Sequence, residues 1–248
     1  MILTPSLNPC QCSMPSIIRR TSANILFREY LVLFMGGSFL TRLKSMHLFH
    51  SSGSLHWLSQ LPEGLEINGP NVYMAKTSPP IVFEMYRMQF QKDFAMFLES
   101  RSKETMHGGH IWSSHLEDEM MWIQVAMIGL VKESEIKSFN VPMYTPYKDE
   151  VMDLIHKQGS FSLDLLESYE VNWDPYDTDY ASVKVSDEPI HGKRVAKILR
   201  AAVEPMLITY FGNSAMDMVF QKFEKYVNEH LSSEKTKHYV ILVSITKI

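Results

Sequence analysis

The sequence has few cysteines and no long apolar run. Cys10 and Cys12 are the two cysteines among 248 residues. They are too close together for a disulfide framework, and a single C-x-C pair lacks the second ligand pair of a zinc site. The best apolar run, residues 25–35, is shorter than the about 18 residues of a membrane span and contains Arg28 and Glu29. We therefore expect a reduced, cytoplasmic protein without a membrane segment.

An excess of basic charge is also absent. The net charge is −4, so no basic field is available to hold nucleic acid or an anionic membrane. What the chain has is apolar content: 45% of its residues are hydrophobic, enough for one large domain with a substantial core.

Several catalytic motifs are missing as well. There is no G-x-S-x-G nucleophile elbow, no G-x-G-x-x-G fingerprint and no Walker sequence. The acidic run 117–119 could serve acid-base catalysis, but such a run is more often a solvated helix start. Two groups of histidines lack an H-E-x-x-H spacing, so a transition-metal site is the less favoured interpretation. These groups are His47, His50 and His56, and His107, His110 and His115.

The stretch from Gly36 to Pro62 is the first candidate for a binding site. An apolar run at 31–35 precedes a Gly-Gly-Ser turn, which predicts a strand that ends in a ligand-facing loop. Serines at 51–54 then predict a short helix over 55–61. By residue type alone, Trp57 is either a core tryptophan or a ligand contact.

Periodicity predicts the remaining elements. The stretch between 106 and 120 offers only residues 110–112 for a strand, which is too short for a central strand. We therefore predict that a strand is missing there, and we predict a loop over 132–146 and a mixture of helical turn and strand over 159–173. The predicted helices are 81–106, 120–131, 148–156, 195–210 with a bend at Pro205, and one starting at 213 or 214, and the predicted strand is 238–246.

A series of segments in a fixed order carries the most specific signal. They are GSFLTRL at 37–43, FHSSGSLHWLSQLPEGL at 49–65, NVYMAKTSPP at 71–80, QFQKDFAMFLESRS at 89–102, EVNWDPYD at 170–177 and VAKILRAAVEPML at 195–207. With this series the chain resembles the plant SABATH methyltransferases, and it looks closest to their salicylate and benzoate carboxyl branch.

The resemblance implies an α/β fold, with a Rossmann-like class I methyltransferase core, truncated at its N-terminal strands, under an α-helical cap. The methyltransferase domain would cover 31–248, with the cap at about 116–158 and 174–204, and residues 1–30 would be irregular. The implied reaction is methyl transfer from S-adenosylmethionine to the carboxylate of a small aromatic acid such as salicylate or benzoate. A homodimer is also implied. Because a carboxylate is already ionised near neutral pH, no catalytic base is expected.

The resemblance also implies roles for individual residues. Ser38 and Phe39 would contact the cofactor. His56 and Trp57 would lie at the substrate carboxylate, and His238 stands where the family has phenylalanine. Further pocket positions are Met121, Trp122, Leu199 and Ala202, and members of a magnesium site are Asn68, Phe139 and Asn140.

Three departures from the family accompany these matches. The family's N-terminal third, with its glycine-rich cofactor loop, has no counterpart here, so we expect weak S-adenosylmethionine binding. Gly53 replaces a pocket tyrosine, and Lys137 replaces a metal-binding aspartate, which disfavours magnesium. The alternatives are a non-catalytic binding or dimerisation module and an unstable product of an incomplete gene model.

Overall fold

The computed structural model describes residues 44–116, 121–177 and 191–248, and in this part of the chain four strands form one mixed sheet. The strand order is β1-β2-β4-β3, with β1 parallel to β2 and β4 antiparallel to both of its neighbours. The strands are β1 (Met46–Ser52), β2 (Thr105–Leu116), β3 (Phe161–Asn172) and β4 (Lys237–Lys247). This sheet with helices packed on it is the predicted α/β architecture.

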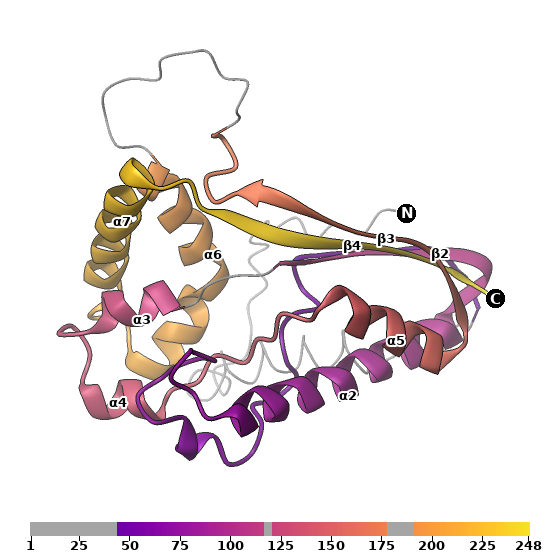
Figure 1. Cartoon of the computed structure of the whole chain (residues 1–248), viewed down its shortest axis with the longest axis horizontal. Coiled ribbons are helices and arrows are strands. Elements are labelled where there is room, and N and C mark those ends of the chain that lie inside the picture. Colours follow the sequence, from indigo (N-terminus) through magenta and orange to yellow (C-terminus); the bar gives the residue numbers. More distant parts are fainter. Residues whose placement is uncertain (1–43, 117–120, 178–190) are drawn as a thin grey trace, which may run out of the picture.

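The helices form two groups around the sheet (Figure 1). Helices α2 (Pro80–Glu104) and α5 (Lys148–Gln158) lie along one face of the sheet. Four others gather at one end of it: α3 (Met121–Met127), α4 (Glu133–Ser138), α6 (His191–Phe211) and α7 (Met216–Ser233). A short 3-10 helix, Leu65–Asn68, precedes α2. None of the described helices is long and apolar enough to cross a membrane.

Helix α2 confirms the prediction for 81–106. Pro80 stands at its first position, where the missing N–H costs nothing. Tyr86, Phe90, Phe94 and Phe97 are all buried, and the rings of Phe90 and Phe94 stack with centroids 5.6 Å apart. These rings occupy one side of the helix and fill the space between α2 and the rest of the core.

The prediction of a missing strand after residue 106 is wrong. Strand β2 has 12 residues and lies between β1 and β4, and its residues 110–114 pair with both neighbours. Pairing on two edges stabilises a strand whose own residues carry a weak β signal. Gly109 is required there, because a Cβ at this position would lie 3.0 Å from the carbonyl oxygen of Met46 and 2.6 Å from Thr105 Cγ2.

Other segments differ in smaller ways. Residues 46–52 form β1, and the helix predicted over 55–61 is wrong, because turns and a single bridge replace it. Residues 161–172 are strand throughout, and α4 interrupts the loop predicted over 132–146. The predictions for α3, α5, α6, α7 and β4 are confirmed to within a few residues. The strand predicted at 31–35 lies outside the described residues.

Candidate functional site

A cavity of about 260 Å³ lies among the loop after β1, the facing ends of β3 and β4, and one side of α6. Five residues that the resemblance assigned to the substrate line it together: His56, Trp57, Leu199, Ala202 and His238. They come from three separate parts of the chain. The rest of the lining is largely apolar, with Trp173, Val195 and Phe223 among it. An apolar cavity with a few convergent polar groups is the usual form of a small-molecule site.

One wall is the loop that carries His56 and Trp57. Segment 142–144 holds this loop through its backbone: Tyr144 N–H donates to the carbonyl of His56 at 2.8 Å, and Leu58 N–H donates to the carbonyl of Pro142 at 2.8 Å. A β-bridge pairs Trp57 with Met143 between these two bonds. The loop therefore has a defined backbone path although it is neither helix nor strand.

His56 is the buried polar group of this wall. Its side chain is nearly closed to solvent, and its Nδ1 has no hydrogen-bond partner among the described residues. Burial disfavours the charged imidazole and lowers the pKa of His56 to about 4. The ring lies beside that of Trp57, with centroids 5.4 Å apart. At neutral pH the cavity therefore presents a neutral imidazole.

The opposite wall is one side of α6. Val195, Ile198, Leu199 and Ala202 line the cavity at helical spacing. Asn228 of α7 accepts a hydrogen bond from Gly192 N–H at 2.6 Å. At Gly192 a Cβ would lie 2.4 Å from a carbonyl oxygen of α7, so the close approach of the two helices requires glycine.

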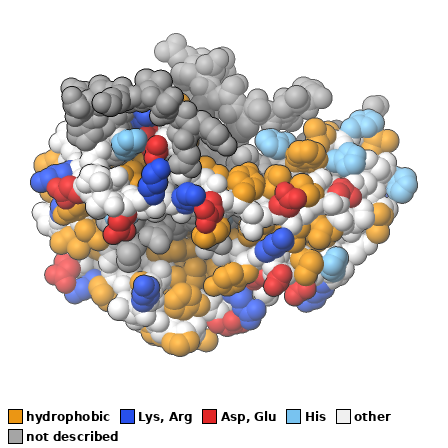
Figure 2. All heavy atoms as spheres, turned by 45° about the horizontal axis from the view of Figure 1, so that its top comes forward, with side chains coloured by type: hydrophobic (Ala, Val, Ile, Leu, Met, Phe, Trp, Pro, Cys, Tyr) orange, Lys and Arg blue, Asp and Glu red, His pale blue; other side chains and the backbone are white. Residues whose placement is uncertain are grey.

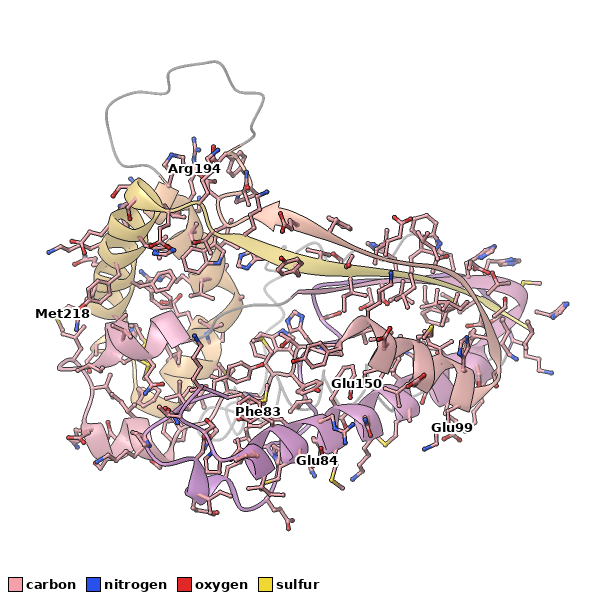
Figure 3. The ribbon with its side chains drawn as sticks, in the orientation of Figure 1. Phe83, Glu84, Glu99, Glu150, Arg194 and Met218 are labelled. Carbon is pink, nitrogen blue, oxygen red and sulfur yellow. The ribbon has the colours of Figure 1, made fainter. Side chains whose placement is uncertain are left out.

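Asp174 holds the start of α6. Its carboxylate is buried and lies 2.7 Å from His191 Nδ1 and 3.3 Å from an Nη atom of Arg194. Figure 3 shows Arg194 at this end of α6, beside the end of β3. These contacts of Asp174 therefore tie α6 to the segment that follows β3.

His238 completes the cavity from β4. It pairs with Val171 of β3, and its ring lies 5.8 Å from that of Trp173. Val171, Asn172 and Trp173 also line the cavity, and sequence reasoning assigned them no role. The register between β3 and β4 brings them there, and no local pattern signals that register. Ile198 and Val195 were also missed, although their spacing from Leu199 and Ala202 on one helix could have indicated them.

Four predicted site residues cannot be placed in the cavity. Ser38 and Phe39 lie outside the described residues. Met121 and Trp122 begin α3, and their side chains lie outside the described part.

The residues predicted for magnesium do not fit a divalent cation. The side-chain oxygen of Asn68 accepts a hydrogen bond from Ser78 at 2.6 Å, and its amide nitrogen donates to two backbone carbonyls. Of the two asparagine side-chain oxygens, that of Asn140 alone lacks a partner in the described part of the chain. Lys137 lines the same surface hollow as Asn140, and an ammonium group there opposes a second cation. Phe139 is a buried core residue.

Within the described ranges, no cluster of charged side chains forms a second candidate site. No group of three or more His, Cys, Asp or Glu side chains in 44–116, 121–177 and 191–248 could hold a metal ion. Acidic and basic side chains alternate over the face in Figure 2, and no broad patch of one sign appears on its described part. The cavity therefore remains the candidate site.

Comparison with known proteins identifies the family. The family profile described as SAM dependent carboxyl methyltransferase matches residues 8–248 of the chain. The chain belongs to this family. The resemblance to SABATH enzymes is thereby confirmed.

Plant methyltransferases are among the most similar relatives. The S-adenosyl-L-methionine:benzoic acid/salicylic acid carboxyl methyltransferase 3 of Petunia hybrida is 40% identical over 232 residues, which cover 86% of this chain and 62% of that protein. Benzoate O-methyltransferase of Zea mays is 36% identical, with 88% of this chain and 64% of that protein covered. The chain thus spans less than two thirds of the length of these family members.

A solved structure supports the fold. The structure described as loganic acid methyltransferase with SAH superposes with a TM-score of 0.70 at 20% identity, over 85% of this chain and 64% of that one. The described strands and helices therefore have the methyltransferase fold predicted from the sequence.

Proposed function

We propose that the chain forms the acid-binding part of an enzyme that transfers a methyl group from S-adenosylmethionine to the carboxylate of a small aromatic acid such as salicylate or benzoate. The observation that supports the proposal is the cavity, which gathers Trp57, His56 and His238 among apolar side chains. The relatives' names support the reaction class. The apolar lining suits an aromatic ring, and the polar groups suit its carboxylate.

The chemistry needs orientation more than acid-base catalysis. A carboxylate is ionised near neutral pH, so one oxygen can attack an electrophilic methyl group without a base. We assign to Trp57 the donation of its indole N–H to the other oxygen, which fixes the attacking oxygen in place. A neutral His56 adds no positive charge beside the carboxylate, and a cationic neighbour would lower its nucleophilicity.

S-adenosylmethionine, when bound, supplies the electrophilic methyl group. The cavity begins at Gly53, directly after β1, at the carboxyl edge of the parallel pair β1 and β2. Ligands of open α/β sheets bind at this edge. This position supports cofactor binding next to the cavity, and we assign the adenosine contacts to Ser38 and Phe39.

Four further assignments complete the proposal. We assign residues 31–248 to the methyltransferase domain, with the cap at about 116–158 and 174–204, and Met121 and Trp122 to the cap wall of the pocket. We also assign a homodimer and a cytoplasmic location. Sedimentation of the purified chain tests the dimer, because a monomer at micromolar concentration would contradict it.

Acid binding is the first test. Calorimetry with salicylate and benzoate should show binding to the unmodified chain, and Trp57→Phe should weaken it about tenfold, because one hydrogen bond to a charged group is lost. Trp112→Phe is the matched control, since Trp112 lies on β2 and outside the cavity lining. Equal affinities for Trp57→Phe and Trp112→Phe would contradict the assignment.

Methyl transfer is the second test. The chain is incubated with radiolabelled S-adenosylmethionine and salicylate, benzoate or jasmonate, and ester product is extracted. Ester formation supports the enzyme. Acid binding without any ester favours the alternative of a non-catalytic binding module.

A further inference from the structure

A buried carboxylate on α2 lies directly beneath the loop that carries His56 and Trp57. Asp93 is fully buried. Its Oδ2 accepts a hydrogen bond from Ser59 N–H at 2.8 Å, and its Oδ1 accepts one from the Ser59 hydroxyl at 2.7 Å. Ser59 follows Trp57 by two residues, so the carboxylate grips the loop immediately beyond the indole.

Gln89 supports this contact from the same helix. It lies four residues before Asp93 and therefore on the same side of α2. Its amide nitrogen donates to Asp93 Oδ1 at 2.9 Å and lies 3.3 Å from the Ser59 hydroxyl. None of the ion pairs within the described residues involves Asp93. The carboxylate is thus held by neutral donors alone, two of which belong to the loop.

The loop is consequently fixed from two sides. Segment 142–144 bonds to the backbone of His56 and Leu58, on either side of Trp57. Asp93 bonds to Ser59 from the direction of α2. Packing alone would not require a carboxylate at this place, because removing one from water is costly and must be offset by hydrogen bonds. A directional acceptor for both donors of Ser59 is what the carboxylate adds.

We propose that Asp93 is a positioning residue of the acid-binding cavity: through Ser59 it sets the place and orientation of the Trp57 indole. The expected effect of Asp93 on acid binding rests on the proposed function. The orientation of Trp57 itself can be measured without any acid.

The test follows the indole ¹⁵N–¹H resonance of Trp57 in Asp93→Asn and in Ser59→Ala. The resonance is assigned to Trp57 because it is lost in Trp57→Phe. Asparagine keeps the size of aspartate but replaces one acceptor oxygen by a donor, so it cannot accept both bonds from Ser59. We expect the resonance to move and salicylate affinity to fall about tenfold. Ser59→Ala keeps the backbone bond and should have a smaller effect on both readouts.

A control variant separates positioning from general destabilisation. Ile155→Val removes a buried methyl group on α5, which does not line the cavity. It should leave the Trp57 resonance in place, and the proposal is overturned if it moves the resonance as far as Asp93→Asn does. An unmoved resonance in Asp93→Asn also overturns it. If Asp93→Asn does not fold, an unmoved Trp57 resonance in Ser59→Ala overturns the proposal instead.

The two proposals can fail separately. A resonance that moves in Asp93→Asn, in a chain that binds no salicylate, supports the positioning of Trp57 and contradicts the proposed function. Salicylate binding that Asp93→Asn leaves unchanged supports the function and contradicts the positioning role.

Discussion

The two walls of the cavity are held by aspartates in different surroundings. On the loop wall, Asp93 is closed to solvent and accepts hydrogen bonds from neutral partners. On the α6 wall, Asp174 is equally buried, but its partners His191 and Arg194, of which Arg194 is a cation, are 47% and 32% exposed. Salt screens exposed charges far more than buried ones, so added salt should weaken the contacts of Asp174 and leave those of Asp93 unchanged. The comparison separates a polar loop wall held by neutral donors from an apolar α6 wall held by partly exposed partners.

Removing the loop anchor should have the largest effect. Asp93→Ala leaves Ser59 and Gln89 without their acceptor, and the loss of three hydrogen bonds to a charged group should lower the free energy of unfolding by about 4 kcal/mol. Urea unfolding measures this change. Ser59→Ala, which removes one donor, should cost about 1 kcal/mol. Similar costs for the two variants would show that Asp93 is not the centre of this network.

The loop wall should also respond to acid through His56. The pKa of His56 falls from 6.5 to about 4 on folding. Between these values the unfolded chain binds more protons than the folded one, so stability is full above pH 6.5 and is lost as the pH falls toward 4, by about 3 kcal/mol in total. Urea unfolding at pH 7 and pH 4 should show a smaller loss in His56→Gln than in the unmodified chain. Equal losses would contradict the burial of a neutral His56.

Removing the α6 anchor should have an intermediate effect. Asp174→Ala should lower the free energy of unfolding by about 2 kcal/mol, because its partners are partly solvated and regain water. The difference between Asp174→Ala and the unmodified chain should shrink in 1 M NaCl, whereas the cost of Asp93→Ala should not. A salt-independent cost at both positions would remove the distinction between the walls.

A change on the apolar side should have the smallest effect on stability. Ile198 lines the cavity but is 51% exposed, so Ile198→Ala should change the free energy of unfolding by less than about 1 kcal/mol. The larger space should improve binding of jasmonate relative to benzoate, as measured by calorimetry. An unchanged preference would show that this side of α6 does not limit the size of the acid.

Local signals predicted some of the elements well. The proline pair at the start of α2 and the row of aromatic residues along this helix mark a helix in any context, because burying that row requires helical spacing. The β-branched run of β4 likewise marks a buried strand. Local signals did not predict strand β2, because its stability depends on pairing with β1 and β4, and the local sequence contains no information on that pairing.

Some residues of the candidate site could be predicted from the sequence and others could not. His56, Trp57, Leu199, Ala202 and His238 were named through family resemblance, and the fold brings them to one cavity. Asp93 and Asp174 could not be predicted, because an aspartate in a helix or loop is usually solvated and nothing local shows that it will be buried. Asn68 was assigned to a metal, and its amide is instead used up by local hydrogen bonds.

The sequence by itself determined the family and the helices with strong periodicity, because ordered motifs and apolar spacing are properties of the chain alone. The tertiary structure decided which side chains meet. Parallel pairing of β1 with β2 sets the loop after Ser52, and the register of β3 against β4 places Trp173 beside His238. The packing of α2 then buries Asp93 under Ser59. These contacts join residues that are far apart along the chain, so they exist only in the folded protein. Their strength depends on burial, which folding also provides.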